Sequence, residues 1–163
     1  MAAGTQWPDG DPFLQRQNEP SIAVSSRNSL HLLAGSNDYR TVDLPGLPDG
    51  ETADAWLGVF KSFDGGLTWK STLLPGCPQN VPQCDGAPAI KGMPAGADPV
   101  VRAGTNGMFY YSGIAFEREE DGDSIVFSAR FMDLNNADGG DPIKFIGTVA
   151  VDHASDGIFI DKP

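Results

Sequence analysis

Two carboxylates stand beside prolines in similar local sequences, and their types and spacing suggest chemistry. Glu19 lies within Asn18-Glu19-Pro20, and Asp98 lies within Ala97-Asp98-Pro99. Carboxylates gathered around one site accept hydrogen bonds from a ligand or bind a cation. The alternative, which we favour, is that each carboxylate caps its own turn or bonds a neighbouring sheet. Asn18, Glu19 and Asp98 are the candidate ligand-facing residues.

Two cysteines flank a short polar segment. Cys77 and Cys84 enclose residues 78–83, a run of Pro, Gln, Asn and Val that we expect to be too polar to pack. Their spacing differs from the CxxC pairs of zinc and redox sites, so a structural disulfide is preferred to a metal or catalytic role. A disulfide predicts an oxidising compartment, extracellular or periplasmic. Residues 1–10 lack the basic and apolar regions of a signal peptide, so either the chain is intracellular or its leader is missing, and the predicted disulfide favours the second alternative.

Metal and nucleophile chemistry have weaker signals. The segment 117–123 is rich in Glu and Asp, and calcium binds six to eight oxygens, but the spacing fits no known calcium loop. A solvated turn is the favoured interpretation, and we expect no cofactor, with calcium as the alternative. His31 and His153 lie near no Ser or Cys motif, so no nucleophilic triad is predicted.

Composition limits the fold and the partners. The 163 residues are 40% hydrophobic, enough to bury a core. Gly and Pro make up about a fifth of the chain, which excludes a helical bundle and favours short strands joined by turns. A net charge of -11 repels phosphate backbones and anionic lipid, so nucleic acid is not an expected partner. No window is apolar enough for a membrane span.

The positioning elements are eight predicted strands in two groups of four. Apolar runs and alternation place them at 21–24, 30–35, 55–62 and 68–74, then at 98–103, 108–116, 124–134 and 143–151. We expect Tyr110 and Tyr111, adjacent in one strand, to split between the core and the opposite face. The predicted organisation is a leader or strap at 1–17, a first unit at 18–75, a cysteine-containing loop at 76–97, a second unit at 98–152 and the start of a third at 153–163.

This repeat predicts an all-β fold built from β-propeller blades. Each group of four strands opens on an acidic residue near a proline, and Asp161-Lys162-Pro163 looks like a third opening. Four antiparallel strands with short turns form a propeller blade, whose innermost strand faces the central channel. A β-sandwich is the alternative, but it gives no reason for the order to restart with the same motif. We expect about two blades and the start of a third.

One motif identifies the kind of blade. The sequence Ser62-Phe63-Asp64-Gly65-Gly66-Leu67-Thr68-Trp69 has Asp and Gly where a tight hairpin needs them. It matches the Asp-box, or bacterial neuraminidase repeat, at Ser62, Asp64, Gly66 and Trp69. The box is a folding device, and we expect Trp69 to bury its ring between neighbouring sheets. The second unit keeps only a vestige at 138–140.

Residues 18–69 resemble the first blade of sialidase-like propellers. The resemblance implies a six-bladed parent and a glycan-directed function, as in glycoside hydrolases and exo-sialidases. Sialidases open this blade with an arginine that binds the substrate carboxylate, and here Asn18 and Glu19 occupy the matching positions. Arg40 follows the second strand, where sialidases also have an arginine.

The resemblance also points to an acidic loop between the second and third strands. Sialidases carry their acid/base aspartate there, and this chain offers Asp43, Asp49, Glu51 and Asp54. Spacing does not choose among them, and a solvated acidic loop is the favoured alternative. The weak catalytic candidates are therefore Arg40, Asp49, Glu51 and Asp54, while the other catalytic residues of sialidases belong to later blades.

Two functions follow from the sequence. The first is a partial sialidase-like propeller that is directed at a glycan or small-molecule ligand but is not catalytic by itself. The alternative is a non-catalytic extracellular propeller that serves as an interaction scaffold. Because two blades cannot close a ring, we expect either the remaining blades of a parent chain or self-association.

Overall fold

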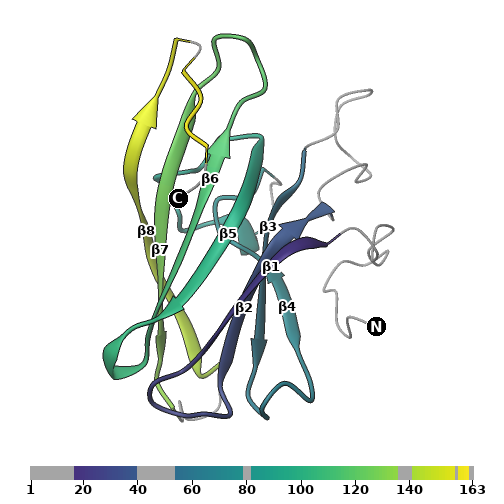
Figure 1. Ribbon diagram of the computed structural model, residues 1–163, viewed down its shortest axis with the longest axis vertical. Coiled ribbons are helices and arrows are strands. Elements are labelled where there is room, and N and C mark those ends of the chain that lie inside the picture. Colours follow the sequence, from purple (N-terminus) through teal and green to yellow (C-terminus); the bar gives the residue numbers. More distant parts are fainter. Residues whose placement is uncertain (1–16, 40–53, 79–81, 136–140, 157, 162–163) are drawn as a thin grey trace.

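The chain forms two antiparallel four-stranded sheets (Figure 1). The computed structural model describes residues 17–39, 54–78, 82–135, 141–156 and 158–161. Sheet A contains β1 (Asn18–Val24), β2 (Leu32–Asp38), β3 (Trp56–Ser62) and β4 (Lys70–Leu73), and sheet B contains β5 (Ala95–Ala103), β6 (Met108–Phe116), β7 (Ser124–Asp133) and β8 (Ile143–Ala154). Each sheet keeps its strands in chain order, and the described residues include no α-helix. The all-β prediction and its eight strands are confirmed.

Some strand boundaries differ from those predicted. β2 continues to Asp38, three residues past the predicted end, although Ser36, Asn37 and Asp38 are polar. All three are buried, and the Asp38 side chain is fully excluded from solvent. Hydrophobic alternation misses this extension because polar residues at the end of the strand are buried as well.

The core lies between the two sheets. Leu33 and Val59 of sheet A and Tyr111 and Phe127 of sheet B are completely buried in one cluster. Contact is close at Gly35, where a Cβ atom would lie 2.6 Å from the Tyr111 ring. The Tyr111 hydroxyl donates a 2.9 Å hydrogen bond to the carbonyl of Gly58. Burial and the charge of Asp38 raise the pKa of Tyr111 well above its usual value.

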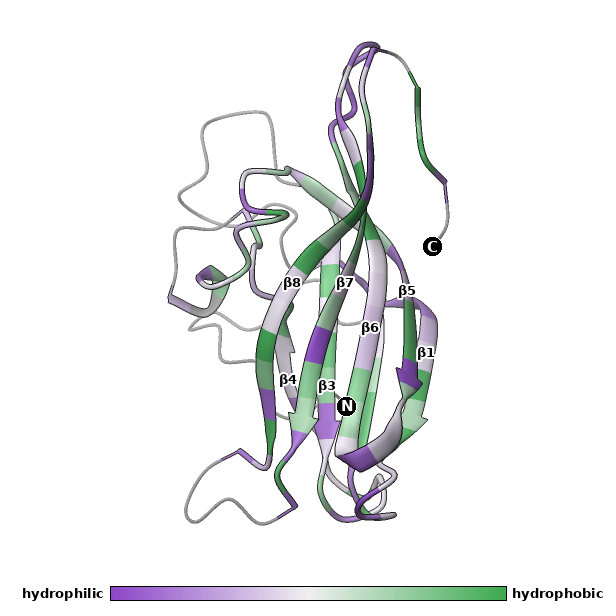
Figure 2. Cartoon of the chain, turned by 90° about the vertical axis from the view of Figure 1, so that its left-hand side faces the viewer, coloured by the Kyte–Doolittle hydropathy of each residue, from purple (hydrophilic) through white to green (hydrophobic). Residues whose placement is uncertain are grey.

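The predicted division of the two tyrosines is confirmed. Tyr111 is fully buried between the sheets, whereas Tyr110 is 44% exposed on the opposite face of sheet B. Since successive strand residues point to opposite faces, this also fixes which residues of β6 face sheet A. Hydrophobic residues lie mainly along the strands, while the β6–β7 hairpin at the top of Figure 2 is hydrophilic.

Strand pairing shows that the sheets repeat one another. The first strand of each sheet has a bulge, which lies before Ser21 in β1 and before Val100 in β5. Glu19 and Asp98 occupy these bulges with φ angles of 51° and 57°. Counted from the bulges, Gly35 of β2 corresponds to Ser112 of β6, because these residues pair with Ser21 and Val100.

The segment after β8 continues this pattern. It runs back from the top of Figure 1 past β6, and the Ile160 N–H donates to Ser124 Oγ over 3.1 Å. Ser124 corresponds to Ala55, whose carbonyl accepts a 2.9 Å hydrogen bond from the N–H of Gly96. The segment after β8 therefore contacts the outer face of sheet B at a position equivalent to the one where β5 contacts sheet A.

The loop before sheet B contains the disulfide. Cys77 and Cys84 are bonded, with their Cα atoms 4.9 Å apart. Both are buried, and they join the core beside Ala87 and Ile90. The buried surface of this loop comes from the two sulfurs and from the apolar residues that follow them, while the expectation that 78–83 is too polar to pack falls largely on residues outside the described ranges. No helix within the described ranges has the length and hydrophobicity to cross a membrane.

Candidate functional site

The two bulged strand heads are joined by one amide side chain. Asn37 of β2 is 7% exposed and lies between them. Its Nδ2 donates to Glu19 Oε2 over 3.4 Å, and its Oδ1 accepts a 2.9 Å hydrogen bond from the N–H of Asp98. The structure thus brings Glu19 and Asp98 into one cluster through a residue that the sequence prediction missed. The polar run at the end of β2 was the available signal.

Backbone strain accompanies this cluster. Glu19 and Asp98 both have left-handed φ values, and both precede a proline, which disfavours compact conformations at that position. A residue in such a backbone conformation costs about 1–3 kcal/mol of folding free energy, and the conformation persists only where surrounding contacts hold it. Asn37 helps to hold Asp98 in this conformation, because its Oδ1 accepts a hydrogen bond from the Asp98 N–H. Asn18, at the start of β1, is exposed beside Glu19.

One acidic candidate forms an ion pair. Asp54, which precedes β3, accepts a hydrogen bond from Nε of Arg118 in the β6–β7 hairpin. Burial favours a higher pKa for Asp54, but the hydrogen bonds from Arg118 and from the N–H of Ala55 outweigh it, so the pKa is lowered. Asp54 is therefore ionised at neutral pH, which suits a general base or an ion pair better than a general acid. Arg118 also lies over the Phe116 ring, 5.2 Å from its centroid.

The remaining catalytic candidates cannot be placed. Arg40, Asp49 and Glu51 lie outside the described residues. The acid/base role and the persisting arginine therefore stay predictions. Cys77 and Cys84 form the disulfide described above, in keeping with their predicted structural role.

The box sequence forms a hydrogen-bonded turn. Asp64 accepts from the Ser62 hydroxyl at 2.8 Å, the Thr68 N–H at 2.9 Å and the Thr68 hydroxyl at 2.5 Å. The N–H of Gly66 donates to the Ser62 hydroxyl over 2.8 Å. These bonds, above all the one from the Thr68 hydroxyl, lower the pKa of Asp64 to about 2. The spacing of the motif is thus explained by a turn whose donors converge on one carboxylate.

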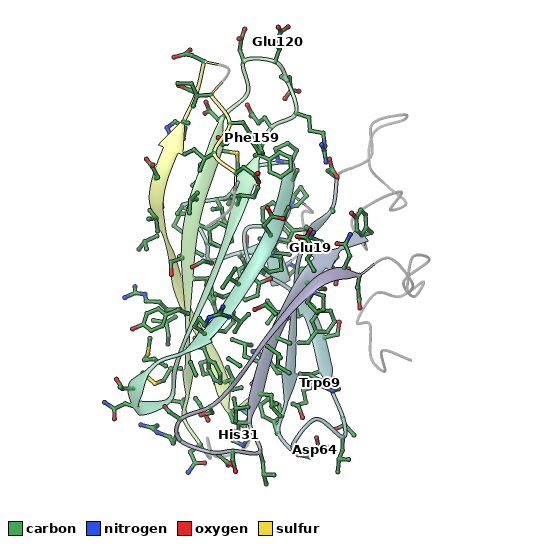
Figure 3. The ribbon with its side chains drawn as sticks, in the orientation of Figure 1. Glu19, His31, Asp64, Trp69, Glu120 and Phe159 are labelled. Atoms are coloured by element: carbon green, nitrogen blue, oxygen red, sulfur yellow. A yellow bond between two sulfur atoms is a disulfide. The ribbon has the colours of Figure 1, made fainter. Side chains whose placement is uncertain are left out.

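Trp69 lies on the face of sheet A that points away from sheet B. Its ring is half-buried and lines a groove there, so its burial between neighbouring sheets stays a prediction. The indole N–H donates a 3.0 Å hydrogen bond to the carbonyl of Gly66, which fixes the ring at the end of the turn. The groove has a volume of about 540 Å³ and is also lined by Pro20, Ile22 and Phe60. Figure 3 shows Asp64 and Trp69 towards the lower end of sheet A, below Glu19.

A buried Ser, His and Asp come together at the lower end of the molecule, near His31 in Figure 3. The Ser25 hydroxyl donates to Asp133 Oδ2 over 2.5 Å, and His31 Nδ1 lies 2.9 Å from Asp133 Oδ1. In a catalytic triad the serine bonds the histidine, whereas here both bond the aspartate. The cluster therefore joins the sheets instead of activating a nucleophile. Sequence gave no signal for it because His31 and Asp133 are 102 residues apart.

Comparisons with known proteins identify no family. No family model matches the sequence, and no curated protein matches it either. Among solved structures, Trypanosoma rangeli sialidase, both by itself and in complex with the inhibitor DANA, aligns with 83% of this chain at 14% identity and a TM-score of 0.49. This chain spans about a fifth of that sialidase, 20% of its length. A similarity this low assigns no residue role.

Among the described residues, no three His, Cys, Asp or Glu side chains form a group that could hold a metal ion. The acidic hairpin at 117–123 carries Glu120 at the top of Figure 3. Calcium binding there stays an untested alternative.

Proposed function

We propose that this chain forms consecutive blades of a sialidase-like β-propeller that binds glycans without hydrolysing them by itself. The proposal is supported by the two repeated four-stranded meanders and by the box turn, in which Asp64 gathers the hydrogen bonds of Ser62 and Thr68. The same repeat places Glu19 and Asp98 at equivalent strand heads. In a closed propeller these heads would face the central channel.

The cluster at the strand heads is the proposed glycan site. Asn18 and Glu19 are exposed, and Asn37 holds Glu19 beside Asp98. Amide and carboxylate groups form hydrogen bonds with sugar hydroxyls. They also repel a carboxylate such as that of sialic acid, because charges of the same sign disfavour one another at close range. The proposed ligands are therefore neutral glycans.

The state of Asp54 supports the proposed lack of turnover. Asp54 has a lowered pKa and pairs with Arg118, so it is a poor proton donor at neutral pH. We expect the chain to release no fluorophore from a fluorogenic sialoside. Measurable turnover that is lost in Asp54→Asn would contradict this part of the proposal.

Binding can be tested by NMR titration with neutral and sialylated oligosaccharides. Neutral sugars should shift the amide signals of Glu19, Asn37 and Asp98, and sialylated ones should do so less. Glu19→Ala should weaken binding by about tenfold, equivalent to about 1.4 kcal/mol. Glu120→Ala, which removes an exposed acid from the distant hairpin, is the matched control. Equal effects of the two variants, or no shifts at the strand heads, would refute a glycan site there.

A non-catalytic interaction scaffold is the second candidate function. The observation that favours it is the amount of apolar surface left on both outer faces, including Ile22 at 54% exposure and Val149 at 46%. Exposed apolar patches mark protein interaction sites. Disulfide bonding in the loop before sheet B is compatible with an extracellular setting for either function.

A further inference from the structure

The outer face of sheet B, defined by Arg102, Tyr110, Ser128, Arg130 and Val149, is an exposed cationic and aromatic surface on an acidic chain. Arg102 pairs in register with Tyr110, and Tyr110 pairs with Arg130, so the three form one row across β5, β6 and β7. Both arginines are exposed, and neither forms an ion pair among the described residues. A chain of net charge -11 thus presents two neighbouring cations here.

Strand pairing relates this exposed surface to an equivalent surface of sheet A that sheet B covers. Because Gly35 corresponds to Ser112, Leu33 corresponds to Tyr110. Leu33 pairs with Lys61, and Tyr110 pairs with Arg130, so Lys61 and Arg130 are equivalent. The outer face of sheet B is therefore the counterpart of the face of sheet A that packs on sheet B.

The contacts of Lys61 indicate which kind of group its equivalent, Arg130, should contact. Its ammonium donates to Asp141 Oδ2 over 2.6 Å and to the carbonyl of Ile143 over 2.7 Å, and it lies 5.7 Å from the centroid of the Phe131 ring. Asp141 lies in the connection that leads into β8, the last strand of sheet B. A cation at this position is thus bound by an acidic residue in the connection that leads into the fourth strand of the next sheet.

The outer face of sheet A, defined by Ile22, Ala34, Ser36, Phe60 and Trp69, is the matching surface. Ile22 corresponds to Val101, which is fully buried against sheet A, yet Ile22 is 54% exposed. The face is hollowed by the groove of about 540 Å³. The Ser36 hydroxyl, on the same face, is buried and has no hydrogen-bond partner among the described residues.

The approach to the fourth strand of sheet A is also acidic. Asp64 lies in the turn that leads into β4, as Asp141 does for β8. Its carboxylate is ionised at neutral pH, and the turn ends on Trp69 in the groove. One outer face therefore carries two arginines that form no ion pair with any described residue, and the other has a carboxylate at the edge of an apolar hollow.

We propose that the outer face of sheet B binds the outer face of sheet A of a second copy of this chain. In this arrangement Tyr110 enters the groove and Arg130 approaches the turn that carries Asp64, a contact analogous to the one that Lys61 makes with the connection before β8. The two faces differ, so the interface is heterologous and adds copies in one direction until a ring closes. The inference goes beyond the proposed function, develops the self-association that the sequence predicts, and does not depend on glycan binding.

The test is sedimentation velocity on the whole chain and on two single variants. Ile22→Glu damages only the sheet A face, and Arg130→Glu damages only the sheet B face. Both residues are exposed, so circular dichroism should show that the variants stay folded. The unaltered chain should associate as concentration rises, and each variant should weaken that association at least about tenfold. Lys91→Glu, at a cation whose side chain is 63% exposed on the cysteine-containing loop, should leave it unchanged.

Mixing the two variants provides the sharper measurement. Each keeps one intact face, so an equimolar mixture should form a heterodimer and nothing larger. A chain that stays monomeric at its highest soluble concentration would overturn the proposal. A mixture that behaves as the sum of its parts, or association that survives in both variants, would also overturn it, because either result excludes this pair of faces. Sedimentation measures association without a glycan, so a failure of the proposed glycan site would not change the outcome of this test.

Discussion

Asp133 shows how one buried charge can determine the contact between the sheets. It is fully excluded from solvent and accepts hydrogen bonds from Ser25 and from the N–H of Asn135, with His31 at 2.9 Å. Arg27 donates to its backbone carbonyl over 2.9 Å. Burial favours a higher pKa for Asp133, but the hydrogen bonds from Ser25, His31 and the Asn135 N–H, with the charge of His31, lower it. A buried carboxylate is tolerated only when it is satisfied in this way.

Replacing Asp133 by Asn tests this role through pH dependence. The folded pKa lies below the ordinary value of 3.8, so the ionised form stabilises the fold at neutral pH, and this contribution is lost as pH falls through the folded pKa. Asp133→Asn should reduce the free energy of unfolding by about 2–4 kcal/mol at neutral pH and by much less in acid. Urea denaturation at both pH values measures the difference. Asp152→Asn, on exposed β8, should change little, and an equal loss at both pH values would contradict the assignment.

Among the elements, the cysteine-containing loop links the two sheets in sequence and packs beside both. Its disulfide closes a short segment whose cysteines are seven positions apart, and both sulfurs join the core cluster. Restricting the unfolded chain in this way contributes about 2–3 kcal/mol to stability. Cys77→Ala combined with Cys84→Ala should lose about that amount in urea denaturation. Mass spectrometry before and after reduction checks the bond, and free thiols in protein purified without reductant would contradict it.

The strands could be predicted from the sequence more fully than the contacts within the candidate site. All eight strands were found because alternation and turn residues are local signals. The end of β2 was missed because Asn37 is polar and its burial depends on the head of another sheet. Arg118 was missed for a similar reason, since its partner Asp54 is 64 residues away. The turn at 62–69 could be predicted from its Asp and Gly residues, but the face of sheet A on which Trp69 lies depends on sheet packing.

For the whole molecule, the contacts between the sheets imply a single cooperative unit. One core cluster includes residues from both sheets and from the cysteine-containing loop. The sheets are joined by Lys61 with Asp141 and, at the strand heads, by Asn37 with Asp98. A domain of this size with one shared core commonly unfolds in an all-or-none transition.

Gly35→Ala tests this cooperativity because it acts at the contact between the sheets. The added methyl would lie 2.6 Å from the fully buried Tyr111 ring, so the sheets must shift, at a cost of about 1–3 kcal/mol. Tryptophan fluorescence reports on sheet A, through Trp69 on its outer face and through Trp56, which is buried beside Gly96 of β5. Hydrogen exchange of β7 amides reports on sheet B. In urea both probes should give the same midpoint, and Gly35→Ala should lower both equally. Tyr111→Leu should make Gly35→Ala less costly. Separate midpoints would mean that the sheets unfold independently, and additive losses would mean that the added methyl does not press on the Tyr111 ring.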